Sequence, residues 1–166
     1  MRIRAETPAD AAAIEALTIA AFAQSSHSSH TEQFIVRALR AAEALTLSLV
    51  AEEDGSLVGH VALSPVSISD GSQGWHGLGP ISVLPQWQRR GIGTRLMHEA
   101  LTQLRASGAA GCVLLGEPGF YTRFGFARHA ALVLPDVPPA YFMALAFGSA
   151  CASGSVRYHP AFEATA

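Results

Sequence analysis

Cysteine is scarce in this sequence, whose 166 residues contain two, Cys112 and Cys151. Two isolated thiols among apolar neighbours cannot form the disulfide framework that is typical of small secreted domains. A chain of this length can bury a sizeable core without cross-links, so we expect a single domain over residues 1–166. Unpaired thiols fit a reducing compartment, which predicts a cytoplasmic protein.

Charged side chains are also few, at 14% of the residues, and the formal net charge is −2. The chain as a whole therefore lacks the electrostatic footprint of a nucleic-acid-binding protein, and its low net charge leaves room for a homodimer. Hydrophobic residues make up 49% of the chain, which excludes disorder over most of its length. No apolar stretch reaches about 18 residues without a polar break, so we expect no membrane association.

The first third of the chain predicts a short strand at Ile3 followed by two helices. The motif Thr7-Pro8-Ala9-Asp10 is typical of a helix start, because a capping threonine precedes a proline at the first helical position. Residues 24–30 are polar and predict a loop, after which Thr31-Glu32 starts the second helix. Apolar residues at helical spacing predict two buried faces, made by Ile14, Leu17, Ala21 and Phe22 and by Phe34, Ile35, Ala38, Leu39 and Ala42.

Strands dominate the remainder of the chain. Turn residues at Asp54-Gly55 and in residues 70–74 separate three predicted strands, over residues 45–53, 57–68 and 75–84. The other predicted elements are a helix over residues 94–106, strands over 112–115, 127–134, 140–147 and 156–158, and helical turns over 118–124. This order of helices and strands predicts a mixed α/β (α+β) fold around one sheet.

The turn between the third predicted strand and the following helix contains Gly91 and Gly93 beside Arg89 and Arg90. A helix N-terminus has unpaired backbone N–H groups and a partial positive charge. Glycines let an anion approach these groups and arginines add positive charge, so we expect the turn to bind a diphosphate. The alternative is that the glycines serve tight packing and the arginines are solvated. The spacing matches neither the dinucleotide-binding fingerprint nor the Walker A loop.

Two motifs carry a family resemblance. Residues 83–93, Val-Leu-Pro-Gln-Trp-Gln-Arg-Arg-Gly-Ile-Gly, resemble the Val-x-Pro-x-x-Gln-x-x-Gly-x-Gly segment of the GNAT N-acetyltransferase superfamily. Residues 119–126, Gly-Phe-Tyr-Thr-Arg-Phe-Gly-Phe, are similar to its Phe-Tyr-x-x-x-Gly-Phe element. With residues 114–118 and 158–162, the chain looks most like the YhbS-like branch of that superfamily. The resemblance implies a GNAT-like acyl-CoA N-acyltransferase fold, with a central mixed, mostly antiparallel sheet flanked by helices.

The resemblance also implies acetyl-CoA as the cofactor. In the family, the turn before the helix binds the pyrophosphate through backbone N–H groups. The preceding strand is splayed from its neighbour and lends its backbone to the pantetheine arm. Pro80 is compatible with such a splay, since proline cannot donate to a sheet ladder. The residues implied for cofactor binding are Ile81, Ser82, Val83, Gln88, Arg89, Arg90, Gly91, Ile92, Gly93, Thr94, Tyr121 and Phe124.

Acetyl transfer needs a polarised thioester carbonyl and a proton for the leaving thiolate. The backbone N–H of Ile81 or Val83 is the candidate for the first role. Tyr121, which matches the family's tyrosine, is the candidate for the second. The alternative is that Tyr121 is a core aromatic residue with a polar tip.

An acceptor amine is protonated at neutral pH, so a base must take its proton. The candidates, acting directly or through water, are Glu32, Glu52, Glu117, His30 and His76. We favour Glu32 as the catalytic residue and His30 as a substrate-binding neighbour, because the loop–helix junction would rim the acceptor site. A first-turn glutamate stabilised by the helix dipole is the alternative for Glu32. The loop over residues 24–30 has no apolar anchor, so we expect it to act as a mobile lid.

Some residues also fit other chemistries or functions. His27, His30 and Glu32 resemble a metal-binding trio, but their loose spacing in a serine-rich segment favours a solvated loop and no metal. The apolar neighbours of Cys112 predict an inert buried thiol, which favours direct attack by a small-molecule or peptide amine over an acyl-cysteine. Two further functions remain open, a non-catalytic CoA-binding or CoA-sensing module and an unrelated phosphate-binding α/β protein.

Overall fold

A six-stranded sheet forms the centre of the molecule in the computed structural model, which describes all residues from Met1 to Ala166. Its strands, in spatial order, are β1 (Arg2–Ala5), β2 (Leu47–Glu53), β3 (Ser56–Pro65), β5 (Trp75–Val83), β6 (Gly111–Leu115) and β8 (Phe142–Ala146). All neighbours pair antiparallel except β5 and β6, which are parallel. The predicted mixed, mostly antiparallel sheet is therefore confirmed.

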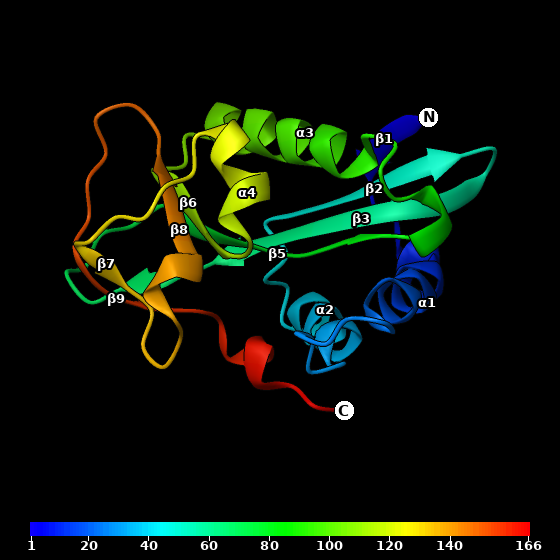
Figure 1. The fold of residues 1–166 in the computed structure, drawn as a ribbon, viewed down its shortest axis with the longest axis horizontal. Coiled ribbons are helices and arrows are strands. Elements are labelled where there is room, and N and C mark those ends of the chain that lie inside the picture. Colours follow the sequence, from blue (N-terminus) through cyan, green and yellow to red (C-terminus); the bar gives the residue numbers. More distant parts are fainter.

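Helices cover both faces of this sheet (Figure 1). They are α1 (Ala11–Phe22) and α2 (Glu32–Ala41) on one face, and α3 (Ile92–Ala106) and the short α4 (Pro118–Tyr121) on the other. Single 3₁₀ turns lie at Pro8–Asp10, Pro85–Trp87, Thr122–Phe124, Pro139–Tyr141 and Pro160–Glu163. None of the helices combines the length and apolar character that a membrane crossing requires.

The buried face of α3 is the one that its sequence predicts, with Leu96, Met97, Ala100, Leu101 and Leu104 all buried. This face packs against β2 and β3 with the main hydrophobic cluster. Gly59 of β3 allows the close approach, since a Cβ there would lie 3.0 Å from side-chain carbons of Ile92 and Leu96. The contact fixes the N-terminus of α3 beside the end of β5.

The buried faces of α1 and α2 differ in part from the prediction. In α1 the buried residues are Ile14, Leu17 and Thr18, whose hydroxyl donates to the Ile14 carbonyl at 2.7 Å. In α2, Val36 is buried together with Ile35 and Leu39, whereas Ala42 is exposed beyond the helix end. A threonine whose hydroxyl is satisfied within its own helix can be buried at little cost, which the apolar pattern alone does not reveal.

Two predicted strands are wrong in extent. The strand expected over residues 57–68 is interrupted after Pro65, because proline cannot donate to the ladder. The next two residues, β4 (Ser67–Ile68), join a small sheet with β9 (Gly154–Arg157) and β7 (Leu132–Val133). In the strand expected over residues 127–134, only β7 and one bridge from Ala127 to Ala144 form. Residues 128–131, which stay outside both sheets, are alanine or polar and offer little apolar surface to bury. In the small sheet, β9 lies between β4 and β7.

The feature that shapes the site is a separation between β5 and β6. These strands pair only at Trp75↔Gly111, His76↔Cys112 and Gly77↔Val113. Beyond Gly77, β5 continues to pair with β3 as far as Val83, with an irregularity opposite Ala62 where Gly79 and Pro80 stand. The last part of β5 therefore has a sheet partner on one side only, as the family resemblance implied.

Candidate active site

Unpaired backbone N–H groups gather at the turn that precedes α3. No N–H from Arg89 to Thr94 donates to a protein acceptor; the first that does is Arg95, at 3.0 Å from the Gly91 carbonyl. Arg89 and Gly91 have left-handed backbone conformations, with φ of 63° and 80°. Residues of this kind turn successive N–H groups toward one concave side, and the helix dipole adds positive potential there. The turn has the geometry of an anion-binding site.

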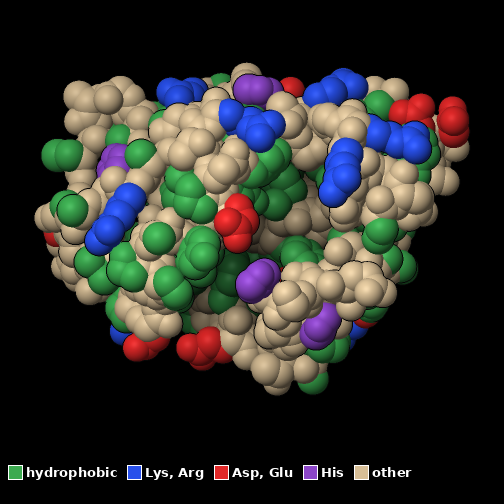
Figure 2. Space-filling view, viewed as in Figure 1, with side chains coloured by type: hydrophobic (Ala, Val, Ile, Leu, Met, Phe, Trp, Pro, Cys, Tyr) green, Lys and Arg blue, Asp and Glu red, His purple; other side chains and the backbone are tan.

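A cavity of about 420 Å³ opens over this turn. It is lined by Val83, Trp87, Gln88, Arg89, Gly91, Ile92, Gly93, Thr94, Phe120 and Arg123. The side-chain amide of Gln88 donates to the Val83 carbonyl at 3.1 Å, which ties the turn to the end of β5. Figure 2 shows arginine side chains along the edge of the molecule where α3 lies. The cavity and the positive charge near it suit a diphosphate.

Three residues of this cavity, Trp87, Phe120 and Arg123, were missed by the sequence analysis, whereas the predicted Arg90 does not line it. The Trp87 and Phe120 rings form part of its wall, and the guanidinium groups of Arg90 and Arg123 lie 4.8 Å from the centres of these two rings. Phe120 and Arg123 belong to the second motif, so the motif itself was the available signal. Phe124 packs instead against His98 and Phe120, at ring distances of 5.1 and 5.3 Å, and lines neither large cavity.

The end of β5 directs backbone donors into the gap beside β6. The Leu84 N–H donates to the Val58 carbonyl at 3.0 Å, toward β3. Because N–H groups alternate sides along a strand, those of Ile81 and Val83 point away from β3. Ser82 has the opposite orientation, and its side chain is buried with the hydroxyl unpartnered. Ile81 and Val83 therefore present N–H groups to the gap, as the resemblance implied.

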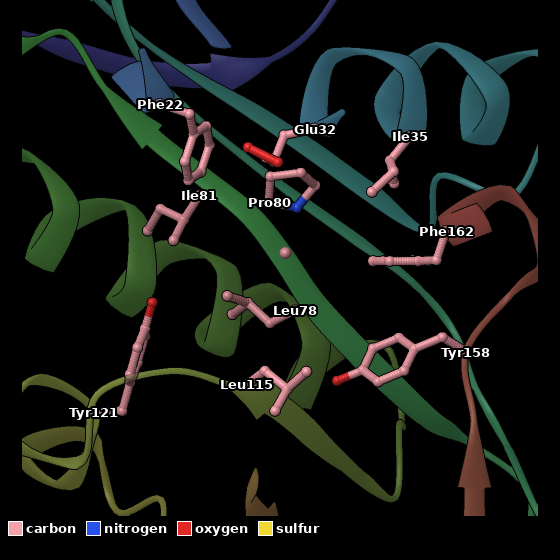
Figure 3. Close-up of a pocket in the computed structure, with 11 residues that line it drawn as sticks. Phe22, Glu32, Ile35, Leu78, Pro80, Ile81, Leu115, Tyr121, Tyr158 and Phe162 are labelled. Carbon is pink, nitrogen blue, oxygen red and sulfur yellow. The ribbon is translucent and has the colours of Figure 1, made fainter. Parts of the chain in front are cut away.

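A second cavity, also of about 420 Å³, lies farther along the same strand (Figure 3). Its lining residues are Phe22, Glu32, Ile35, Leu78, Gly79, Pro80, Ile81, Leu115, Tyr121, Tyr158 and Phe162. Ile81 borders this cavity and Val83 borders the first, so the two cavities lie along one splayed strand. A long ligand that follows β5 can reach from the anion-binding turn to Tyr121 and Glu32.

Tyr121 is held by a close approach to the backbone. Its ring lies against Gly116, where any Cβ would collide with it, and packs edge-to-face on Phe120 at 4.9 Å. Figure 3 shows the hydroxyl directed toward Ile81. Burial raises the pKa of the Tyr121 hydroxyl above its ordinary value, so the group stays protonated and able to donate.

Glu32 is the one carboxylate that lines the second cavity. It stands at the first position of α2, and Figure 3 shows its carboxylate beside Phe22 and Pro80. The Ser28 hydroxyl donates to one carboxylate oxygen, and the Thr31 N–H donates to the other at 3.3 Å. The loop before α2 is thus hydrogen-bonded to the group that we expected to serve as base.

The other base candidates lie elsewhere. His30 is exposed, lines neither large cavity, and donates its N–H to the Ser28 hydroxyl at 2.8 Å. Glu52 is ion-paired with Arg4 at 3.2 Å, and Glu117 is exposed at the start of α4. Burial lowers the pKa of His76, which lines a shallow groove beside β4.

Two alternative chemistries lack support in the geometry. Cys112 is completely buried, and burial raises the pKa of its thiol, so the reactive thiolate is strongly disfavoured. No group of three or more histidine, cysteine, aspartate or glutamate side chains is placed to hold a metal ion. The candidate catalytic groups are therefore backbone N–H donors, the Tyr121 hydroxyl and the Glu32 carboxylate.

Comparisons with known proteins agree with this geometry. The family described as acetyltransferase (GNAT) domain matches residues 45–128, which include both sequence motifs. The uncharacterized N-acetyltransferase YhbS of Escherichia coli is 39% identical over 127 residues, which are 76% of this chain and 73% of that protein. The chain therefore belongs to the GNAT family and is an N-acetyltransferase.

Two solved structures are similar to this chain over nearly its whole length. A GNAT family acetyltransferase from Brucella melitensis, in complex with acetyl-CoA, is 54% identical with a TM-score of 0.87, covering 98% of this chain and 97% of that one. Escherichia coli YhbS in complex with CoA is 34% identical with a TM-score of 0.86, covering 97% and 91%. The predicted family and its YhbS-like branch are confirmed.

Proposed function

We propose that this chain transfers the acetyl group of acetyl-CoA to a primary amine, by direct attack within a ternary complex. The observation that carries the proposal is the splayed end of β5, whose free N–H groups connect an anion-binding turn to a cavity holding Tyr121 and Glu32. The two similar structures that contain acetyl-CoA or CoA support the same cofactor here.

The residues present fit this cofactor. The unpartnered N–H groups from Arg89 to Thr94 would hold the pyrophosphate, and the N–H groups of Ile81 and Val83 would hold the pantetheine arm. Bound there, acetyl-CoA supplies an acetyl group already activated as a thioester. The N–H of Ile81, which faces the gap, stabilises negative charge as it develops on the carbonyl oxygen.

Tyr121 is the proposed general acid. Its hydroxyl remains protonated at neutral pH and points toward Ile81, where the reacting carbonyl is expected. A thiol has an ordinary pKa of about 8.5 and a phenol one of about 10. The hydroxyl therefore stabilises the leaving thiolate first by hydrogen bonding, and donates its proton as negative charge accumulates on sulfur.

Glu32 is the proposed acceptor-side group. An amine of pKa about 10.4 costs roughly 4–5 kcal/mol to deprotonate at neutral pH. The Glu32 carboxylate attracts the ammonium form into the cavity and takes up its proton directly or through water. His30 precedes Glu32 by two residues and is exposed, and we propose that it contacts the acceptor from outside the cavity.

The loop over residues 24–30 is the proposed lid. Its side-chain hydrogen bonds are local, such as the His27 N–H donating to the Ser25 hydroxyl at 3.3 Å, or lead to Glu32. A segment with few distant anchors can open at low cost. Hydrogen exchange should show fast exchange over residues 24–32 that slows when acceptor and CoA are added. Protection equal to that of β3 before any addition would contradict the lid.

Release of free CoA from acetyl-CoA, measured with a panel of amines and short peptides, tests the enzymatic proposal. The chain contains no lysine, so any acetyl-lysine product comes from the added acceptor. We expect amine-dependent release that Tyr121→Phe strongly reduces. Binding of acetyl-CoA with no amine-dependent release across the panel would favour a CoA-binding module instead.

A further inference from the structure

The wall of the second cavity restricts the chemistry of the acceptor. One part of it is built by Phe22 of α1, Ile35 of α2 and Phe162 of the C-terminal turn, together with Tyr158, which lies between β9 and that turn (Figure 3). Leu78 and Leu115 extend this apolar surface from β5 and β6. The hydroxyl of Tyr158 is buried and has no hydrogen-bond partner, and Figure 3 shows it directed toward Leu115.

Charge on this wall is limited to one group. Glu32 is the single carboxylate among the lining residues, and no basic side chain lines the cavity. One carboxylate can neutralise one ammonium group. A diamine or polyamine would bring a second positive charge against Ile35, Phe162 or Tyr158, where no second carboxylate compensates for its lost hydration.

The apolar wall is firmly positioned. The Tyr158 and Phe162 rings pack against each other with their centres 4.9 Å apart and tilted by 50°. The 3₁₀ turn that carries Phe162 is capped by His159, whose Nδ1 accepts the Ala161 N–H at 3.0 Å. Ala161 is buried with Ile35 and Leu39 of α2. This aromatic corner can therefore receive a rigid apolar group without rearrangement.

We infer that the acceptor is a small primary amine with a single cationic nitrogen on an apolar, preferably aromatic body, such as an arylalkylamine. The nitrogen lies near Glu32 and the body lies on the aromatic corner of Tyr158 and Phe162. A volume of about 420 Å³ is within the roughly 300–1,000 Å³ of small-molecule sites. The inference rests on the proposed function, because it takes this cavity as the acceptor site.

Calorimetric titration in the presence of saturating CoA tests the acceptor class without turnover. The probes are 2-phenylethylamine, isoamylamine, putrescine and a lysine-containing peptide. Burial of an aromatic group predicts that 2-phenylethylamine binds at least about tenfold more tightly than putrescine. Equal or tighter binding of putrescine or of the peptide would overturn the inference.

A matched pair of variants locates the preference. Phe162→Asp adds a carboxylate to the apolar wall and should weaken 2-phenylethylamine at least about tenfold while strengthening putrescine. Thr165→Asp adds the same charge at an exposed position on the same segment and should leave both affinities unchanged. Phe162→Leu keeps the wall apolar and should retain the preference for 2-phenylethylamine, so the test survives if Phe162→Asp fails to fold. A preference unchanged in Phe162→Asp would overturn the inference.

Turnover separates this inference from the proposed function. If arylalkylamines bind with the expected preference but release no CoA from acetyl-CoA, the enzymatic proposal fails and the ligand class stands. If CoA release is fastest with putrescine or the peptide, the enzymatic proposal stands and the acceptor class is wrong.

Discussion

His60 should make the stability of this protein depend on pH between neutrality and about pH 4. The side chain is 0% exposed in the middle of β3. Ser48 donates to Glu6 and accepts from Nε2 of His60, 2.8 Å away, while Nδ1 has no partner. Burial lowers the pKa of His60 from 6.5 to about 4, although the Glu6 carboxylate, itself paired with Arg40, partly offsets the shift.

The sign and size of the effect follow from proton linkage. Between pH 6.5 and about 4 the unfolded chain binds a proton at this histidine and the folded chain does not, so acidification favours unfolding. The contribution is fully present above pH 6.5 and is lost as the pH falls toward 4. A pKa lowered by this amount corresponds to about 3 kcal/mol, a large part of a typical total stability of roughly 5–15 kcal/mol.

Urea unfolding at several pH values from about 7.5 to 4.5 measures this loss. His60→Gln retains hydrogen-bonding capacity without the titration, and should remove most of the pH dependence. His76 is a second contributor, because burial also lowers its pKa, so His76→Gln should remove a further part. His27→Gln at an exposed position is the control and should leave the slope unchanged. A His60→Gln protein with the wild-type slope would refute the argument.

Three further predictions concern the site. Gly91→Glu should abolish acetyl-CoA binding in a thermal-shift titration, because it places a carboxylate beside the anion-binding N–H groups at a φ of 80°. Arg89→Ala should have a milder effect, and a normal response to CoA in Gly91→Glu would refute the cofactor assignment. Tyr121→Phe should lower kcat on the order of 10²-fold in a CoA-release assay with nearly unchanged cofactor affinity; wild-type kcat would exclude the acid role. Glu32→Gln should lower kcat or raise the acceptor KM with acetyl-CoA binding unchanged, and unaltered acceptor kinetics would exclude its role.

Local sequence patterns predict the anion-binding turn before α3. Strand, glycine-containing turn and helix are consecutive in the chain, so the motif around Gly91 and Gly93 already specifies which N–H groups remain free. The close packing of α3 on Gly59 then places the turn beside β5. The start of α2 at Glu32 was predicted as well, because a helix start after a polar loop is readable from the sequence; its role at the cavity stays a prediction.

The acceptor side could not be predicted in the same way. Phe22, Ile35, Tyr158 and Phe162 come from α1, α2 and the C-terminal turn, and no spacing in the sequence indicates that they meet. Phe22 was expected in the buried face of its helix, but it faces the cavity. The interrupted strand after Pro65 and the small sheet formed by β4, β9 and β7 were missed because such short strands form only through tertiary pairing.

The short parallel pairing of β5 with β6 divides the central sheet into two halves. One half contains β1, β2, β3 and β5, and the other contains β6 and β8. Only the residue pairs from Trp75↔Gly111 to Gly77↔Val113 connect them within the sheet. A pantetheine arm lying along Ile81 and Val83 would occupy the position of a strand between β6 and the last part of β5, where the two strands do not pair. Cofactor binding then becomes a structural event as well as a catalytic one, in which the ligand completes the sheet that holds it.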